Sequence, residues 1–388
     1  MSVGGGRLAL LLGFLEQDPA NLPLLQDAAD CALQEGQWAQ ARALVERALV
    51  LAPQDPASRF RLATICTHEG DCAAGLALTQ ALLDEGQCQD AVLFQHALAL
   101  ILANRHGEAE PILAALQPRA ASLPGFDHLY VRALHAAGKL DQAIQVAIAL
   151  GEDPIAQGML SLLHVDHDQL EPGRALAQSV LAAHPHNIDA LLAAGTAGLA
   201  LEQHGLALSV FERAASVHPG NGRAWMGIGL TRLSAADYAG ARQALEKAVR
   251  LLPSHLGTWN ALAWVQLMQD DLPAAEATLS SALAADRNFG ETHGSLAVLK
   301  TMQQDWDAAG REAAIALRLQ PESFAGRFAQ SLLLEHRSQP AQARALLLQV
   351  MQGFPAPAGG NLIDVVRRHA ARQGRQPFHP PSIRKEKQ

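Results

Sequence analysis

Aromatic residues are scarce in this sequence: Phe, Trp and Tyr make up only 4% of its 388 residues, although 49% of the residues are hydrophobic. Ala and Leu supply most of the apolar surface, a balance that suits close packing of helices through small side chains. Lysine is also rare, with 5 of the 30 basic residues. This bias towards Arg is typical of GC-rich bacterial genes, so we expect a bacterial protein.

Long apolar runs are absent as well. No run reaches the ~18–20 residues of a membrane span. The segment 8–15 has the length of a signal-peptide core, but Arg7 is the only charged residue before it and no small-residue cleavage site follows. We therefore expect no signal peptide and a cytoplasmic location. Since Pro19 lies 34 residues before Pro53, the segment 7–17 is better interpreted as one helix of an incomplete leading repeat.

Cysteine and the common catalytic motifs are nearly missing. The four cysteines (Cys31, Cys66, Cys72 and Cys88) show no Cys-x2-Cys spacing, so we expect free, partly buried thiols. The sequence contains no P-loop, no dinucleotide-binding glycine pattern, no serine-nucleophile elbow and no His-Glu-x-x-His motif. We expect a protein that is not an enzyme, with no catalytic residues, no cofactor and no bound metal.

The charge is negative and uneven. The net charge is −8, but residues 366–388 hold seven Lys/Arg and one Glu, a net of +6, which leaves −8 − 6 = −14 for residues 1–365. Binding to nucleic acid depends on clustered Lys and Arg that contact phosphates. An acidic body therefore argues against a nucleic-acid partner.

A period of 34 residues runs through most of the sequence. Two successive copies show it most clearly: Leu191, Gly195, Ala207, Phe211 and Pro219, followed by Trp225, Gly229, Ala241, Leu245 and Pro253. The spacing predicts two short helices per repeat. Small residues would let the two helices approach, large residues would fill the gaps between repeats, and proline would end the second helix.

The period divides the chain into five predicted segments. These are a leading half-repeat (1–21), an N-terminal array of repeats one to four (22–153), a C-terminal array of repeats five to ten (154–357), an amphipathic capping helix (358–373) and a disordered basic tail (374–388). The fourth repeat is about four residues short, because the next proline-phased repeat begins near Pro154. The predicted fold class is all-α.

These residues resemble the tetratricopeptide-repeat family. The resemblance covers roughly nine tenths of the chain and implies a right-handed superhelical solenoid that acts as a scaffold. In this family a protein or peptide partner usually binds a concave groove formed by the first helices. The groove positions of the family correspond here to Phe94, Leu98, Leu192, Met226, Leu230, Leu233, Asn260, Trp264, Met268, Met302 and Phe328. We expect an apolar groove, and we expect Trp264→Glu to abolish partner binding while leaving helicity and melting behaviour nearly unchanged.

Three alternatives stay open at this point. The groove residues could pack between adjacent first helices instead of facing a partner. The chain could be a chaperone-like assembly factor for an envelope or secretion complex. It could also be a metal-dependent enzyme that uses His164, His167 and Asp168, which lie close together in sequence. The Lys/Asn carboxylate clamp and the asparagine ladder of two specialised versions of the family are absent from the corresponding positions, and the sequence does not address the oligomeric state.

Overall fold

The computed structural model describes residues 5–353, and every regular element in this range is helical. The all-α prediction is therefore confirmed. The predicted capping helix (358–373) and basic tail (374–388) lie outside the described residues, as do the last residues of the tenth predicted repeat. None of the helices between residues 5 and 353 is both long and apolar enough to cross a membrane.

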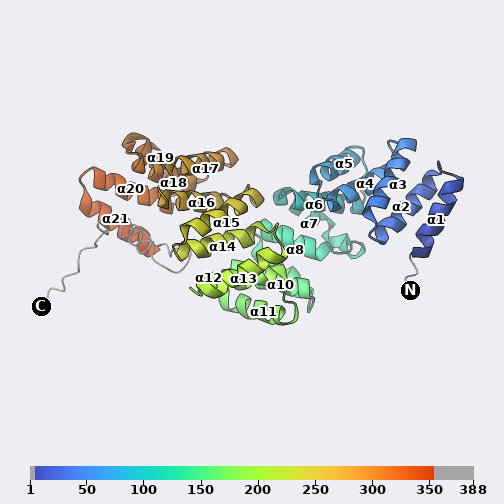
Figure 1. Cartoon of the computed structure of the whole chain (residues 1–388), viewed down its shortest axis with the longest axis horizontal. Coiled ribbons are helices and arrows are strands. Elements are labelled where there is room, and N and C mark those ends of the chain that lie inside the picture. Colours follow the sequence, from blue (N-terminus) through green and yellow to red (C-terminus); the bar gives the residue numbers. More distant parts are fainter. Residues whose placement is uncertain (1–4, 354–388) are drawn as a thin grey trace. The chain divides into compact units, whose positions relative to one another are not determined.

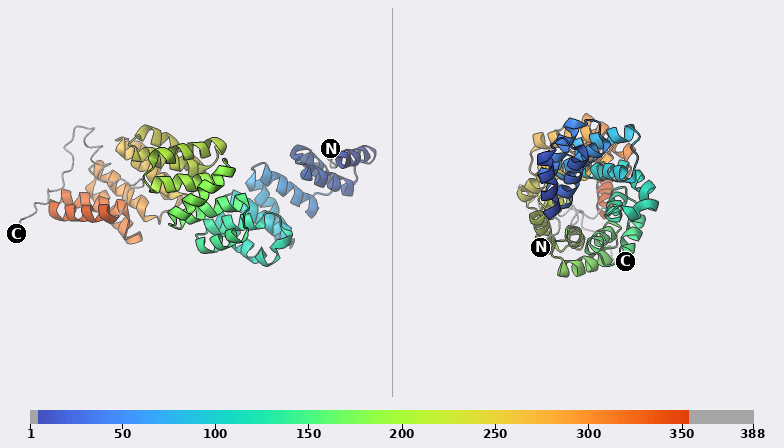
Figure 2. Two further views of the ribbon diagram at one scale, coloured as in Figure 1. Left: turned by 90° about the horizontal axis from the view of Figure 1, so that it is seen from below. Right: turned by 90° about the vertical axis from the view of Figure 1, so that its right-hand side faces the viewer.

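The helices follow one another as antiparallel pairs (Figures 1 and 2). In chain order they are α1 (Gly5–Gln17), α2 (Leu22–Gln34), α3 (Trp38–Leu51), α4 (Pro56–His68), α5 (Cys72–Asp84), α6 (Asp90–Leu102), α7 (His106–Leu116), the 3-10 helix η1 (Gln117–Ser122), α8 (Phe126–Ala136), α9 (Leu140–Ala149), α10 (Pro154–Asp166), α11 (Leu170–Ala183), α12 (Ile188–Ala200), α13 (His204–Val217), α14 (Gly222–Ser234), α15 (Tyr238–Leu251), α16 (Leu256–Met268), α17 (Leu272–Ala285), α18 (Gly290–Met302), α19 (Trp306–Leu319), α20 (Phe324–His336) and α21 (Pro340–Gly353). From α2 onward they form ten helix pairs, as the 34-residue period predicts.

The chain forms two compact units, one ending at Ala156 and the other beginning at Gln157. The fourth helix pair closes the first unit with a short second helix, α9, of 10 residues, against 14 in α3 and in most second helices of the other unit. The predicted limits of the two arrays, 22–153 and 154–357, stay a prediction.

The turn inside each pair has one fixed backbone conformation. The fifteenth residue of each repeat lies in this turn, and its φ is positive, between 59° and 88°, in all ten repeats. Glycine occupies this position in three of them, and the other seven hold Asn104, Asp168, Glu202, Ala236, Asp270, Gln304 and Ser338. The left-handed conformation closes the first helix, because the following N–H then reaches back five residues, as Asp305 N–H does to the Lys300 carbonyl oxygen at 3.0 Å.

Contacts between neighbouring repeats are not symmetric. In the second unit α12 contacts α14, α14 contacts α16, α16 contacts α18, and α18 contacts α20, so the first helices touch one another directly. The second helices pack mainly against the first helix of their own repeat and that of the next. Helices in direct contact lie on the inner side of a curved stack. The first helices thus form the inner layer, which is the layer that the family resemblance assigns to the groove.

One side-chain hydrogen bond recurs at the start of four successive first helices. A donor at the fourth repeat position bonds the backbone carbonyl oxygen six residues earlier, in the preceding turn. The donors are Trp225 Nε1, Trp259 Nε1, His293 Nε2 and Arg327 Nε, and the acceptors are the carbonyl oxygens of Pro219, Pro253, Arg287 and Pro321, at 2.9, 2.9, 2.9 and 3.0 Å. Three residue types thus serve one position, because the fold requires only an N–H at that point.

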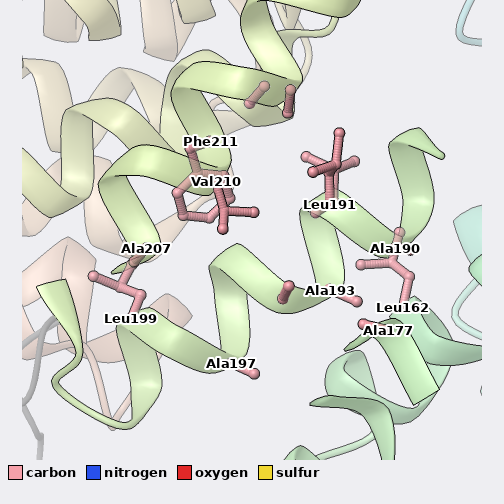
Figure 3. Close-up of a cluster of buried hydrophobic side chains, with 14 of the residues drawn as sticks. Leu162, Ala177, Ala190, Leu191, Ala193, Ala197, Leu199, Ala207, Val210 and Phe211 are labelled. Carbon is pink, nitrogen blue, oxygen red and sulfur yellow. The ribbon is translucent and has the colours of Figure 1, made fainter. Parts of the chain in front are cut away.

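The core explains the small residues of the repeat. Figure 3 shows Phe211 of α13 in the largest buried cluster, together with Leu191 of α12. A Cβ atom added to Gly195 of α12 or to Gly227 of α14 would lie 2.6 or 2.5 Å from the Phe211 ring. The ring therefore fills the gap between two successive first helices, and only glycine leaves room for it on both sides.

Candidate functional site

The predicted groove residues belong to both units. Phe94 and Leu98 lie on α6 of the first unit, and the other nine lie on α12, α14, α16, α18 and α20 of the second unit. Met302 is exposed, Leu192 and Asn260 are buried, and the remaining eight are half-buried. The predicted positions therefore differ in how much surface they offer.

Asn260 is a buried polar residue that joins α16 to α18. Its Nδ2 donates hydrogen bonds to the Leu256 carbonyl oxygen at 3.0 Å and to Thr292 Oγ1 at 2.9 Å. Its Oδ1 accepts a hydrogen bond from Ser295 Oγ at 2.9 Å. With 4% of its surface exposed and its amide satisfied, Asn260 holds two inner helices together and offers no free group to a partner.

Leu192 is buried in the cluster that also contains Leu191 and Phe211, and 3% of its surface is exposed.

An ion pair in the second unit joins two first helices. Arg223 of α14 makes two hydrogen bonds to the carboxylate of Asp166 on α10, one of them at 2.8 Å. The pair connects first helices two repeats apart, so the α12 repeat between them is bridged by charged side chains.

Trp264 of α16 is the centre of an aromatic group. Its ring centroid lies 6.0 Å from that of Phe324 and 5.9 Å from that of Phe328, both on α20. The intervening helix α18 carries Gly294, where an added Cβ would meet the backbone of Ala325 and Gly326. Glycine thus brings α18 and α20 together, and it leaves space for a side chain of α16 to reach α20. Because of this packing, Trp264→Glu would cost stability, contrary to our expectation from sequence.

Met226, Met268 and Met302 provide the flexible part of this inner face. Met226 lies on α14, where its sulfur lies 3.3 Å from Thr258 Oγ1 of α16. Met268 is the last residue of α16, and Met302, the last residue of α18, is 39% exposed. Unbranched thioether side chains adapt to irregular apolar surfaces. Leu230 and Leu233 of α14 each pack at the edge of a buried cluster.

His255 is the titratable residue beside this face. Its Nδ1 accepts a hydrogen bond from the Thr258 backbone N–H at 3.2 Å and so caps α16. Burial, and to a lesser degree the nearby Arg223 guanidinium, lower the pKa of His255 below its usual value. The imidazole is therefore neutral in the folded protein at neutral pH, and the face has no free cation at this point.

In the first unit, Phe94 packs against Phe126 of α8, with ring centroids 6.1 Å apart. Leu98 lies one turn further along α6, at the edge of the same buried cluster. Leu98 also lines a hollow between α4 and α6.

The sequence did not point to every residue of these surfaces. Phe324 was missed, although its spacing of four from Phe328 on a first helix was an available signal. Arg223 was missed because its partner Asp166 is 57 residues away and only the repeat phase relates them.

The histidine cluster does not form a ligand set. His164 Nδ1 is hydrogen-bonded to Gln169 Oε1 at 2.6 Å, and Asp168 occupies the left-handed position of the turn. Within residues 5–353 no three His, Cys, Asp or Glu side chains come together in a way that could hold a metal ion. The geometry therefore gives no support to a metal-dependent reaction at His164 and His167.

Comparison with known proteins agrees with the helix pairs. A family model described as tetratricopeptide repeat matches residues 8–64 and 232–299, and a second model of the same description matches residues 192–255. No curated protein matches the sequence significantly.

Three solved structures are similar to this chain to different degrees. The human IFIT1 dimer with m7Gppp-AAAA is 12% identical, with a TM-score of 0.52, over 86% of this chain and 90% of that one. The Cut9 and Hcn1 complex of APC/C is 15% identical, with a TM-score of 0.42, over 88% of both chains. PilF of Pseudomonas aeruginosa is 18% identical, with a TM-score of 0.43, over 57% of this chain and 96% of that one. At such identities the likeness concerns the fold alone. The three matched segments and the ten helix pairs between residues 22 and 353 therefore show that this chain is built of tetratricopeptide repeats.

Proposed function

We propose that this protein is a non-enzymatic scaffold whose second unit binds an apolar segment of a protein partner. The binding surface is the inner groove, which we define as Met226, Leu230, Trp264, Met268, Met302 and Phe328. The observation that carries the proposal is that these apolar side chains, on four consecutive inner helices, all keep exposed surface. The apolar residues between the helix pairs are in contrast almost fully buried.

The chemistry of the groove indicates the kind of partner. Polar side chains beside it are already paired within the chain: Arg223 with Asp166, and Asn260 with Thr292 and Ser295. Affinity must then come mainly from burial of apolar side chains, at about 25 cal/mol per Å² of apolar surface. Methionine and aromatic side chains in a groove suit an amphipathic helix whose apolar residues recur every three or four positions.

The proposal is tested by site-specific crosslinking in cells of the native organism. A photoreactive amino acid replaces Met302 in one variant and Leu319 in another. The two side chains are both 39% exposed, but Met302 ends the first helix α18 and Leu319 ends the second helix α19. We expect a defined crosslinked partner from position 302 only. Equal crosslinking from position 319, or none from position 302, would contradict the proposal.

A further inference from the structure

The first unit contains a hollow of about 580 Å³ that is lined by residues of its first three repeats. Pockets that hold small-molecule ligands have volumes of about 300–1,000 Å³. Its lining includes the rings of Trp38 of α3 and His68 of α4 and the side chains of Leu98 and Leu102 of α6. The hollow is therefore bounded by apolar and aromatic side chains from different repeats.

The aromatic part of this lining is a stack of two rings. The rings of Trp38 and His68 stack with centroids 3.5 Å apart and an angle of 13° between their planes. The corresponding repeat positions of the second unit hold the same stack, Trp306 on His336, at 3.7 Å and 6°. The stack is thus a regular contact between repeats, and in the first unit it lines the hollow.

The hydroxyls of Thr67 and Thr64, which line the hollow, can accept hydrogen bonds but have no proton left to donate to a ligand. The Thr67 hydroxyl donates its only proton to the Ala63 carbonyl oxygen at 2.7 Å. Thr67 Oγ1 can therefore only accept from Gln95, whose Nε2 lies 3.1 Å away. This requirement fixes the orientation of the Gln95 amide, because the opposite orientation would place two acceptors together. Thr64 likewise donates its hydroxyl proton to the Phe60 carbonyl oxygen at 3.1 Å.

Gln95 Oε1 consequently has no hydrogen-bond donor from the described part of the chain. The residue is 7% exposed and lines the hollow, so its oxygen depends on whatever enters the hollow. The oxygen is accessible from the hollow, where water can donate to it, and an apolar ligand that displaced this water would leave Gln95 Oε1 without a donor. A ligand that supplies an N–H or O–H at this point would therefore be favoured over an apolar ligand of the same shape.

We propose that the hollow binds an aromatic side chain that carries a hydrogen-bond donor, the indole of a Trp or the phenol of a Tyr in a partner protein. The ring packs between the Trp38–His68 stack and the two leucines Leu98 and Leu102, and the N–H or O–H donates to Gln95 Oε1. This site belongs to the first unit, and it does not depend on the inner groove proposed for the second.

A native thiol makes the proposal testable without knowledge of the partner. Cys72 lines the hollow and is half-buried, Cys31 and Cys66 are buried, and Cys88 is exposed. In the full-length Cys88→Ser protein, small disulfide probes can therefore be exchanged onto Cys72 and their retention measured against increasing reductant by intact-protein mass spectrometry. The probe is indole-3-acetic acid linked through cysteamine. Its matched control is the benzothiophene analogue, which has the same shape with sulfur in place of the N–H.

We expect the indole probe to withstand about fivefold more reductant than the benzothiophene probe, the value of one ordinary hydrogen bond. The difference should disappear in Gln95→Met, whereas Leu98→Ala should reduce the retention of both probes. Equal retention of the two probes in the parent protein would overturn the proposal, and this comparison needs no variant that might misfold. Retention of an isovaleryl probe as strong as that of the indole would also overturn it. Either failure would leave the crosslinking test of the second unit unaffected.

Discussion

Gly294 gives the sharpest structural prediction, because a matched glycine lies in the same repeat. An added Cβ at Gly294 of α18 would lie 2.8 Å from Ala325 C and Cβ and still closer to the backbone N of Gly326, both on α20. An added Cβ at Gly310, inside α19, meets nothing within 4 Å. Replacement by alanine favours the helix by about 0.5–1 kcal/mol at either position. Only at Gly294 does it also force two helix backbones apart, at about 1–3 kcal/mol.

We therefore expect Gly310→Ala to be more stable than the parent protein and Gly294→Ala to be less stable, with a difference of about 2 kcal/mol between them. Urea unfolding followed by circular dichroism measures this difference. Because repeat arrays can unfold in parts, hydrogen exchange of the α18 and α20 amides should be measured as well. The contact between α18 and α20 would be refuted if Gly294→Ala were stabilised as much as Gly310→Ala.

Three further predictions follow from the side chains and turns. Burial lowers the pKa values of His96 and His255, so both imidazoles stay neutral to a lower pH in the folded chain than in the unfolded chain. The unfolded chain binds more protons as the pH falls below about 6.5, so the melting temperature should drop between pH 7.5 and 5.5, and less so in His96→Gln. Asn260→Leu removes three hydrogen bonds and strands Ser295, so urea unfolding should show a loss of about 2–4 kcal/mol; a loss below about 0.5 kcal/mol would contradict the network. Gln304→Gly relieves a φ of 63°, so the free energy of unfolding should rise by about 1 kcal/mol, and a fall would count against the turn conformation.

The repeat could be predicted from sequence because its signals are local or periodic. Proline ends the second helix, and small residues recur where helices approach, so the spacing alone determines the helix pairs. Positions that need only a hydrogen-bond donor to a carbonyl oxygen, or only a certain backbone conformation, are harder to recognise in a sequence. Trp225, Trp259, His293 and Arg327 all donate to a carbonyl oxygen six residues earlier, yet no single residue type marks the position. The left-handed turn position is similar, because most repeats hold a residue other than glycine there.

The candidate site was harder to predict because exposure depends on neighbouring repeats. Repeat counting assigns Asn260 and Trp264 alike to the groove. Asn260 is buried because Thr292 and Ser295 of α18 supply partners for its amide. Trp264 contacts α20 because the intervening α18 has Gly294 at the contact. The burial of Asn260 and the contact of Trp264 depend on pairs of residues about one or two repeats apart. Assigning each residue by its position within one repeat does not take such pairs into account.

The most direct test of the inner groove is the affinity of the partner identified by crosslinking for two single variants. Met302→Glu places a charge on the inner layer, and Leu319→Glu places the same charge at an equally exposed position on the outer layer. Isothermal titration should show at least about tenfold weaker binding for Met302→Glu, which corresponds to about 1.4 kcal/mol. Leu319→Glu should bind like the parent protein. Unchanged binding by Met302→Glu, or equal losses in both variants, would contradict the groove.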